Sequence, residues 1–214
     1  MTPIVLRADD GRPLPFDPAR WHGEPTALED CLLDDMTGPV LDVGCGPGRL
    51  VVGLGRRGIP ALGVDPAPGA IALARQRGAS VLQRSVFDPL PGEGRWRTVL
   101  LLDGNVGIGG DAVRLLRRCR SLMAPDATLV AEVDAPGVGW RTCRARLERD
   151  EQRGPWFAWT VVGADAIASV AEDAGLSVTA MMRGAERRWF AYLSTPSRAA
   201  GVDAGSAGVG RVSA

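Results

Sequence analysis

The chain has 214 residues, enough for one domain with a sizeable hydrophobic core but too few for two full domains. Its 25 basic residues, all of them arginine, balance its 25 acidic residues, so the formal net charge is zero. A balanced charge provides no overall field to attract nucleic acid or an anionic membrane, and it favours a small molecule as the partner. The absence of lysine indicates the codon bias of a GC-rich bacterial genome, and not a binding function.

The cysteines are scattered, with no C-x-x-C pair and a single histidine to join them in a metal site. They are Cys31, Cys45, Cys119 and Cys143. We therefore expect buried free thiols, no bound metal and a reducing, cytoplasmic location. No N-terminal stretch has the pattern of a secretion signal, and no apolar run approaches the ~18 residues of a membrane span.

Residues 1–25 are polar and interrupted by prolines, which predicts an N-terminal arm without a long helix. The bulky aromatic side chains of the arm are Phe16, Trp21 and His22. Residues 26–36 then have apolar residues at helical spacing, with Thr26 as a candidate N-cap. We expect the main domain to begin at this helix and to extend to residue 194.

Residues 40–50 read Val-Leu-Asp-Val-Gly-Cys-Gly-Pro-Gly-Arg-Leu, an apolar run that breaks into three glycines at alternate positions. The string predicts a buried strand, a tight loop and a helix N-terminus, where a ligand can lie against main-chain N–H groups. A dinucleotide site has G-x-G-x-x-G spacing and binds a pyrophosphate at the helix N-terminus. Here the spacing is G-x-G-x-G, and the preceding Asp42 would repel phosphate but attract an ammonium group.

This string resembles motif I of the class I S-adenosylmethionine-dependent methyltransferases. The resemblance covers residues 39–194 in the order of the predicted elements. It implies an α/β, Rossmann-like, doubly wound sheet of seven strands with one antiparallel strand. It also implies S-adenosylmethionine as cofactor, S-adenosylhomocysteine as product, and methyl transfer to an O, N, S or C nucleophile. The cofactor contacts that it implies within motif I are Asp42, Gly44, Cys45, Gly46 and Gly48.

The second predicted strand, residues 59–64, ends in Asp65 and Pro66. A carboxylate at this place accepts hydrogen bonds from both ribose hydroxyls of a nucleotide. The alternative is an Asp that caps the helix predicted after Pro68, and the two functions are compatible. We expect Asp65 and Pro66 to contact the cofactor.

Residues 84–91 resemble the family's loop over adenine but depart from its pattern. Val86 stands where many relatives carry an acid for the adenine amino group. Either Asp88 supplies this contact from a shifted loop, or backbone groups of Val86 and Phe87 supply it together with apolar packing.

The strongly apolar strand 97–102 ends in Asp103, Gly104 and Asn105. In the family that the chain resembles, this loop lies beside the transferable methyl group. The resemblance therefore implies cofactor contacts from Asp103 and Gly104 and a substrate contact from Asn105, unless the segment is only a polar turn. Asp103 is a candidate general base, and His22 is the other. Asp134, at the end of the fifth strand, faces Asp103, but no third ligand completes a metal site.

Residues 138–162 follow the fifth strand and predict an inserted β-hairpin. Its tryptophans are Trp140, Trp156 and Trp159. Two interpretations remain open: a lid over the substrate, or a hairpin that extends the sheet or pairs with another subunit. The arm is equally open, either as a pocket wall that includes Trp21 or as a segment packed on the surface. These tryptophans predict a small, rather apolar methyl acceptor.

Two strands, 176–182 and 188–193, are expected to close the sheet, and residues 195–214 to form a disordered tail. The chain is expected to be a monomer or a homodimer. Two other functions remain. One is a binding protein or rearrangement catalyst that uses S-adenosylmethionine without methyl transfer. The other is an NAD-dependent oxidoreductase, which the glycine spacing and Asp42 oppose.

Overall fold

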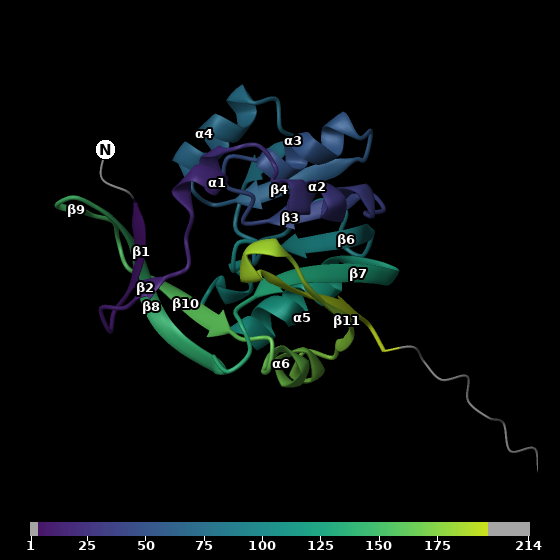
Figure 1. Ribbon diagram of the computed structural model, residues 1–214. Coiled ribbons are helices and arrows are strands. Elements are labelled where there is room, and N and C mark those ends of the chain that lie inside the picture. Colours follow the sequence, from purple (N-terminus) through teal and green to yellow (C-terminus); the bar gives the residue numbers. More distant parts are fainter. Residues whose placement is uncertain (1–3, 197–214) are drawn as a thin grey trace, which may run out of the picture.

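The computed structural model of the protein describes residues 4–196 and contains two β-sheets (Figure 1). The larger sheet has seven strands in the order β11-β12-β7-β6-β3-β4-β5. Its strands are β3 (Val40–Val43), β4 (Ala61–Asp65), β5 (Val81–Gln83), β6 (Trp96–Leu101), β7 (Met123–Val133), β11 (Ser177–Arg183) and β12 (Trp189–Ser194). β12 runs antiparallel to both of its neighbours, and the strands from β7 to β5 are parallel. The predicted α/β, doubly wound, seven-stranded sheet with one antiparallel strand is confirmed.

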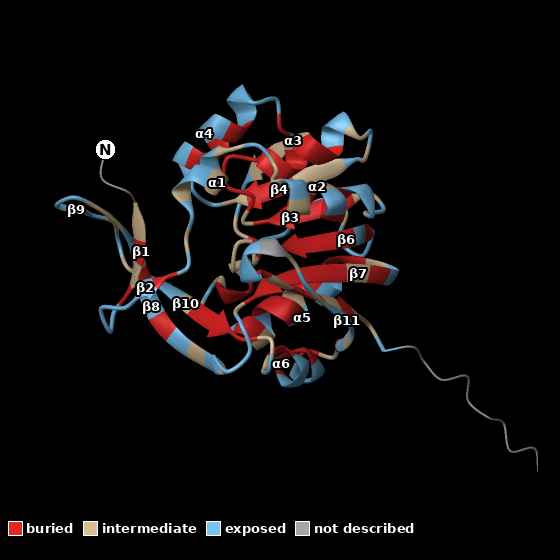
Figure 2. Ribbon diagram, in the orientation of Figure 1, coloured by how far each residue is buried: buried red, intermediate tan, exposed pale blue. Residues whose placement is uncertain are grey.

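Helices pack on both faces of this sheet. They are α2 (Ala27–Asp34), α3 (Arg49–Arg56), α4 (Pro68–Gln76), α5 (Ala112–Leu122) and α6 (Ile167–Asp173). Successive side chains of a strand point to opposite faces. Leu100 of β6 accordingly packs with α2 and α3, whereas Leu101 packs with α5 and α6. Figure 2 shows the resulting burial of the central strands on both faces, which explains why their sequences are continuously apolar.

Helix α2 begins as its sequence predicts. The side chain of Thr26 accepts a hydrogen bond from the backbone N–H of Glu29 at 3.3 Å, and the Glu29 carboxylate accepts one from the N–H of Thr26 at 2.9 Å. This reciprocal pair satisfies two N–H groups that a helix start leaves without partners. It also fixes the position of the Glu29 side chain, which is fully buried.

The second sheet has the path β10-β8-β1-β2, with β9 paired to β8. Its strands are β1 (Val5–Ala8), β2 (Pro13–Leu14), β8 (Trp140–Arg149), β9 (Gln152–Arg153) and β10 (Phe157–Val162). The predicted hairpin after the fifth strand is confirmed as β8 and β10. The pairing of β1 with β8 was not predicted, because a strand of four residues gives little signal and its partner lies about 140 residues away. The division of the chain at residue 25 stays a prediction.

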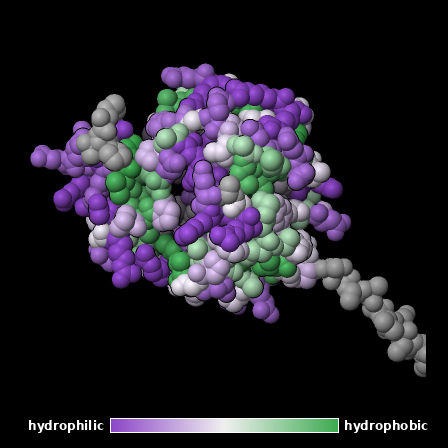
Figure 3. Space-filling view, in the orientation of Figure 1, coloured by the Kyte–Doolittle hydropathy of each residue, from purple (hydrophilic) through white to green (hydrophobic). Residues whose placement is uncertain are grey.

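The second sheet stands beside the carboxyl ends of the parallel strands (Figure 1). Two isolated bridges join the parts: Ile108 pairs with Trp159, and Asp134 pairs with Gly163. The Thr142 hydroxyl also donates to the carbonyl oxygen of Gly110 at 3.2 Å. In the space-filling view, apolar residues of the second sheet border a hollowed region between that sheet and the main body (Figure 3).

Three further predictions differ from the structure or lie outside it. β7 begins at Met123, five residues before the predicted start, directly after α5. Cys45, Cys119 and Cys143 are buried and free as expected, but Cys31 is exposed, because it lies on the outer side of α2. The predicted disordered tail lies, from residue 197 onward, outside the described residues. Within residues 4–196 no helix is long and apolar enough to cross a membrane.

Candidate functional site

The glycine loop between β3 and α3 has a backbone that side chains would disturb. Gly44, Gly46 and Gly48 have φ angles of 74°, 51° and 77°, which L-amino acids with a Cβ rarely adopt. A Cβ on Gly44 would lie 2.6 Å from Nδ2 of Asn105, and a Cβ on Gly46 would meet the indole nitrogen of Trp21. The side chains of Asn105 and Trp21 therefore pack directly against the backbone of the loop.

Asp42 lies beneath this surface on β3 and is almost fully buried. Its Oδ2 atom has no hydrogen-bond partner among the described residues. Burial raises the pKa of Asp42 to about 7, although the positive charge of Arg49 opposes the shift. A buried acceptor without a donor costs free energy, and Oδ2 of Asp42 is one of three such side-chain atoms among the described residues.

Asp65 at the end of β4 connects the glycine loop to α4. Its Oδ2 accepts a hydrogen bond from the N–H of Gly46 at 3.1 Å, and its Oδ1 accepts one from the N–H of Ala67 at 2.8 Å. Burial raises the pKa of Asp65, while these two hydrogen bonds lower it. Asp65 does not cap α4 as expected, because the N-cap is Ala67 and none of the described side chains accepts from the first turn. Its carboxylate instead fixes the turn before the helix and lines a hollow.

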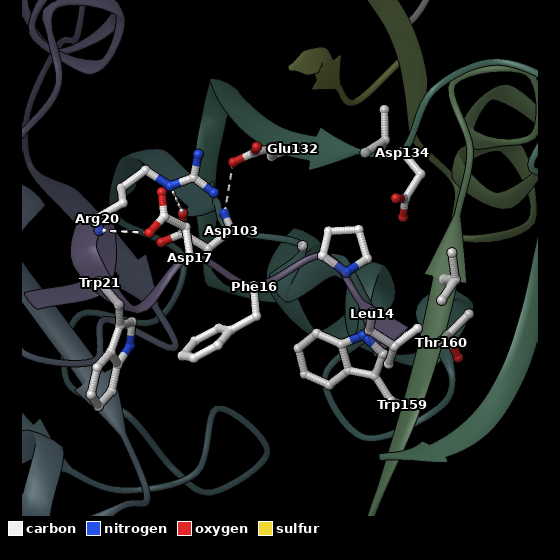
Figure 4. Close-up of a pocket in the computed structure, with 14 residues that line it drawn as sticks. Leu14, Phe16, Asp17, Arg20, Trp21, Asp103, Glu132, Asp134, Trp159 and Thr160 are labelled. Carbon is white, nitrogen blue, oxygen red and sulfur yellow. Dashed lines mark hydrogen bonds and ion pairs between the residues drawn. The ribbon is translucent and has the colours of Figure 1, made fainter. Parts of the chain in front are cut away.

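Two adjoining hollows open at the carboxyl ends of the strands. We call the first the glycine-loop hollow; its lining includes Gly44, Asp65, Pro66, Ala67, Asn105, Ile108, Gly109, Leu147 and Phe157. The second, the β7 hollow, is lined at its inner end by Leu14, Asp17, Arg20, Gly104, Glu132, Val133, Asp134, Thr160 and Val161 (Figure 4). The cavity volume of the β7 hollow is about 70 Å³, and that of the glycine-loop hollow is about 490 Å³. Four side chains line both hollows: Phe16, Trp21, Asp103 and Trp159.

Six charged side chains form a network beside the two hollows, with three acids balancing three arginines. We call the following set the charge network: Glu29, Arg49, Asp103, Glu132, Arg188 and Arg20. Arg49 donates to Glu29 at 2.6 Å and contacts both oxygens of Asp103 at 3.0 and 2.8 Å. Arg188 donates to both oxygens of Glu132 at 2.7 Å and to Glu29 at 3.0 Å. Arg20, from helix α1 (Pro18–His22) of the arm, lies 3.3 Å from Asp103.

Ion pairing shifts the pKa values of three buried members of this network, Glu29, Arg49 and Arg188. Burial alone would raise the pKa of Glu29, but the hydrogen bonds and charge of Arg49 outweigh burial and hold that pKa at about 2. The same pairing raises the pKa of Arg49 and of Arg188 against the effect of burial. Glu29, Arg49 and Arg188 are therefore charged at neutral pH.

Comparison with known proteins identifies the family of the chain. A family model described as a methyltransferase domain matches residues 24–181. The chain belongs to this methyltransferase family. The resemblance seen in the sequence is thus confirmed for the family. No curated protein sequence matches the chain at a significant level.

Solved structures share the fold of this methyltransferase at low identity. An S-adenosylmethionine-dependent methyltransferase from Bacteroides fragilis, in complex with S-adenosyl-L-homocysteine, is 20% identical, with 91% of this chain and 89% of the other covered and a TM-score of 0.74. The CcbJ methyltransferase from Streptomyces caelestis is 17% identical, with coverages of 84% and 97% and a TM-score of 0.61. The 1,6-didemethyltoxoflavin-N1-methyltransferase from Burkholderia thailandensis is 19% identical, with coverages of 77% and 75% and a TM-score of 0.56.

Asp103 occupies the junction of the two hollows of the methyltransferase, but its groups already have partners. Both carboxylate oxygens contact Arg49, and its backbone N–H donates to Glu132 at 2.8 Å. Asn105 has a similar structural part, because its amide donates to the carbonyl oxygens of Val43 and Gly44 at 2.9 and 3.0 Å. Asn105 thus lines the glycine-loop hollow and holds the glycine loop, and it does not line the β7 hollow.

The predicted adenine loop borders the methyltransferase's glycine-loop hollow without lining it. Val86 is buried, and Phe87 packs against Gly109 beneath the guanidinium of Arg114, which lies 4.4 Å from the ring centre. Asp88 is exposed, and its carboxylate accepts a hydrogen bond from the N–H of Ser85 at 3.2 Å. The Asp88 side chain therefore stabilises its own turn.

Two residues of motif I face away from both hollows. The Cys45 thiol is buried beside Val51, and burial raises its pKa. Gly48 packs against Ala79, whose Cβ would lie 2.8 Å from a Cβ at Gly48. Both positions support the loop from behind, as close packing of helix on strand requires.

The aromatic candidates divide into two groups. Trp21 and Trp159 line both hollows, as predicted for substrate contacts. Trp156 instead packs against the guanidinium groups of Arg144 and Arg146, and Trp140 is 56% exposed. His22 is exposed, with its ring 4.6 Å from that of Trp21. The structure does not place Trp140, Trp156 or His22 in either hollow.

The sequence did not indicate the charge network. One signal was available: Glu132 lies within an apolar strand, between Ala131 and Val133, where an unpaired charge would be costly. No metal site accompanies the network, since no three His, Cys, Asp or Glu side chains within residues 4–196 form a group suited to a metal ion.

Proposed function

We propose that this methyltransferase transfers a methyl group from S-adenosylmethionine to a nucleophilic atom of a small, rather apolar molecule. The observation that carries the proposal is the junction of the two hollows. One hollow ends at the glycine loop and Asp65, the other ends inside the second sheet, and four side chains line both. A cofactor in the first and an acceptor in the second would meet beside Phe16, Asp103 and Trp159.

The residues of the glycine-loop hollow fit S-adenosylmethionine. Gly44 lines the hollow with backbone alone, and Gly46 leaves room for the indole of Trp21, which lines the same hollow. The buried Oδ2 of Asp42 offers an acceptor to the amino group of the cofactor, directly or through water, and Asp65 offers oxygens to its ribose hydroxyls. Pro66, Ile108 and Gly109 line this hollow and supply apolar surface for adenine. When bound, S-adenosylmethionine supplies an electrophilic methyl group on a sulfonium that leaves without acid catalysis.

The chain itself contributes mainly position and exclusion of water. Aromatic side chains at the junction separate the acceptor from bulk solvent, and the charge network fixes Asp103 and Gly104 at the end of β6. Alignment of two bound reactants supplies several kcal/mol of a reaction barrier, so a dedicated general base is optional. We further infer a cytoplasmic protein, since its four cysteines are free thiols.

The first experiment is a calorimetric titration of the purified protein with S-adenosylmethionine, S-adenosylhomocysteine and NAD. We expect micromolar affinity for the first two and none for NAD. Binding of NAD alone, or of none of the three, would contradict the proposal.

The second candidate function is binding of S-adenosylmethionine without methyl transfer. A turnover assay distinguishes it from the proposed transferase. A panel of small acceptors with O, N, S and C nucleophiles is incubated with labelled S-adenosylmethionine, and release of S-adenosylhomocysteine is measured. Release with a methylated product supports the transferase, whereas tight binding without any product across the panel favours the second candidate.

A further inference from the structure

Asp134 is the acidic side chain of the β7 hollow that the fold itself does not use. It directly follows β7, where its backbone N–H donates to Val162 and its carbonyl oxygen accepts from Ala164, both at 2.9 Å. Its carboxylate points into the β7 hollow (Figure 4). Within residues 4–196 this carboxylate accepts no hydrogen bond and forms no ion pair.

The other acids of the hollow already have partners. Asp103 and Glu132 belong to the balanced charge network. Asp17 caps α1 by accepting hydrogen bonds from the N–H groups of Ala19 and Arg20 at 2.9 and 3.1 Å. Among the described residues, Asp134 is therefore the acid of this hollow whose carboxylate has neither an ion pair nor a hydrogen bond.

Charges on neighbouring elements do not neutralise Asp134 closely. Arg141 on β8 acts on it at longer range and lies 3.6 Å from Asp10. Asp165 next to α6 adds no positive charge, and its Oδ1 accepts from the N–H of Gly139 at 3.3 Å. Burial raises the pKa of Asp134, the charge of Glu132 adds to the rise, and Arg141 opposes it. A cation in the hollow would lower that pKa again.

Aromatic rings form the opposite wall of the same hollow. Phe16, Trp21 and Trp159 line it, together with aliphatic surface from Leu14, Val133 and Val161. Aromatic faces attract ammonium groups, and they also pack against apolar carbon. A carboxylate and aromatic rings thus favour the same ligand by two separate interactions.

We propose that the methyl acceptor is a small apolar molecule with a protonated amine, which Asp134 binds in the β7 hollow. The inference rests on the proposed function, since it names the substrate class of that site. An alcohol of the same shape would form only a neutral hydrogen bond to Asp134, and a carboxylic acid would be repelled by Asp134. Hydrogen bonds between charged groups are the stronger kind, which corresponds to roughly tenfold tighter binding of the amine.

The test compares matched probes that differ in one group. Tryptamine, tryptophol and indole-3-propionate form one set; 2-phenylethylamine, 2-phenylethanol and 3-phenylpropanoate form a smaller one. Their dissociation constants are measured by calorimetry, with and without saturating S-adenosylhomocysteine. We expect, in at least one set, an amine that binds about tenfold tighter than its alcohol, with no binding of the acid.

The variant Asp134→Asn should remove this preference and leave the affinity for S-adenosylhomocysteine and the melting temperature unchanged. Asp134→Ser is the second variant, in case the amide finds a new partner. Asp150→Asn, in the exposed turn between β8 and β9, is the matched control and should keep the preference.

Four results would overturn the proposal: equal binding of amine and alcohol, tighter binding of the acid, a preference that survives in both Asp134 variants, or no binding of either amine. Failure of the proposed function is a different result, namely no binding of S-adenosylhomocysteine. The titrations without this compound test the amine preference in that event as well.

Discussion

The two hollows of this methyltransferase are built in contrasting ways. One wall of the glycine-loop hollow comes from a contiguous segment, residues 44–67, whose ends are joined by hydrogen bonds such as that from Gly46 to Asp65. Its other lining comes from the arm, the loop after β6 and the second sheet. The β7 hollow depends on strands from residues 5–14 and 140–162, and on a charge network that extends from Glu29 to Arg188. A local motif thus forms one wall of the glycine-loop hollow, and long-range pairing forms the β7 hollow.

Substitutions that change substrate specificity should cost less stability in the second sheet than in the glycine loop. The glycine loop tolerates little, because its backbone angles and close contacts need particular residues. The second sheet has its own small apolar cluster, which includes Leu6, Cys143 and Val161, and it can change its lining without disturbing the loop. The charge network connects the two halves through Asp103, so its removal should damage both.

The largest effect is expected from the variant Arg188→Met, which tests whether the charge network supports both halves. The variant leaves the buried carboxylates of Glu29 and Glu132 with one guanidinium fewer. Removal of one partner from a buried ion pair costs about 3–5 kcal/mol of unfolding free energy. Urea denaturation followed by circular dichroism measures the loss.

Arg95→Met, in the exposed turn before β6, is the control for loss of an arginine and should cost less than about 0.5 kcal/mol. The double variant Arg188→Met/Glu132→Gln should be more stable than Arg188→Met alone, since it removes one uncompensated charge. A loss below about 1 kcal/mol for Arg188→Met would show that the halves do not depend on the network.

A smaller effect is expected from acid, and it concerns Glu29. The pKa of Glu29 is about 2 in the folded protein against 4.5 as the reference value. Because the folded value is the lower one, the ionised carboxylate contributes stability above pH 4.5, and this contribution is lost as the pH falls from 4.5 to 2. The loss amounts to about 3 kcal/mol over this range.

The measurement is the unfolding free energy from urea titrations at pH 6, 4.5 and 3. Glu29→Gln should be less stable than the wild type at pH 6 and should lose less stability on acidification. Parallel curves for the two proteins would show that other carboxylates cause the acid sensitivity.

The sequence predicted those elements that follow each other directly along the chain, and it did not predict contacts between distant segments. Motif I and Asp65 were found because strand, loop and helix follow each other directly. The seven strands were found for the same reason. All four candidate tryptophans were predicted from composition to contact the acceptor, but only Trp21 and Trp159 line the hollows. Trp140 and Trp156 lie elsewhere, because the register of strand pairing decides on which face of a strand a residue lies.

Asn105 and β1 are two features whose contacts could not be predicted from the sequence. The loop that carries Asn105 was placed correctly, yet the direction of its amide is decided by carbonyl groups of Val43 and Gly44, about 60 residues earlier. β1 has four residues, and its pairing with β8 follows from the position of the hairpin in the folded chain. Such contacts have no counterpart in local sequence patterns.

The cofactor side gives a sharper, smaller prediction at Asp65. Asp65→Ala removes the oxygens expected to bind the ribose, and it also releases the N–H groups of Gly46 and Ala67. We expect the dissociation constant for S-adenosylhomocysteine to rise about 10- to 100-fold in calorimetry. Asp88→Ala is the matched control, since that carboxylate bonds within its own turn. If Asp88→Ala weakened binding as much, the Asp88 side chain would be shown to contact adenine, which was one of the two alternatives from the sequence.

The smallest effect is expected from His22→Ala, although His22 is the only histidine of the chain and was a candidate base from the sequence. Its ring is exposed beside Trp21 and lines neither hollow, and its carbonyl oxygen, which the variant keeps, accepts a hydrogen bond from Arg77. We therefore expect kcat to change less than about twofold between pH 6 and 8, whereas Trp21→Ala, one residue away, should raise KM for the acceptor. A tenfold fall in kcat with unchanged affinity for S-adenosylhomocysteine would mean that the arm turns during turnover and brings the imidazole to the acceptor. The cofactor side alone would then be fixed by local sequence, and the acceptor side would be completed only when both reactants are bound.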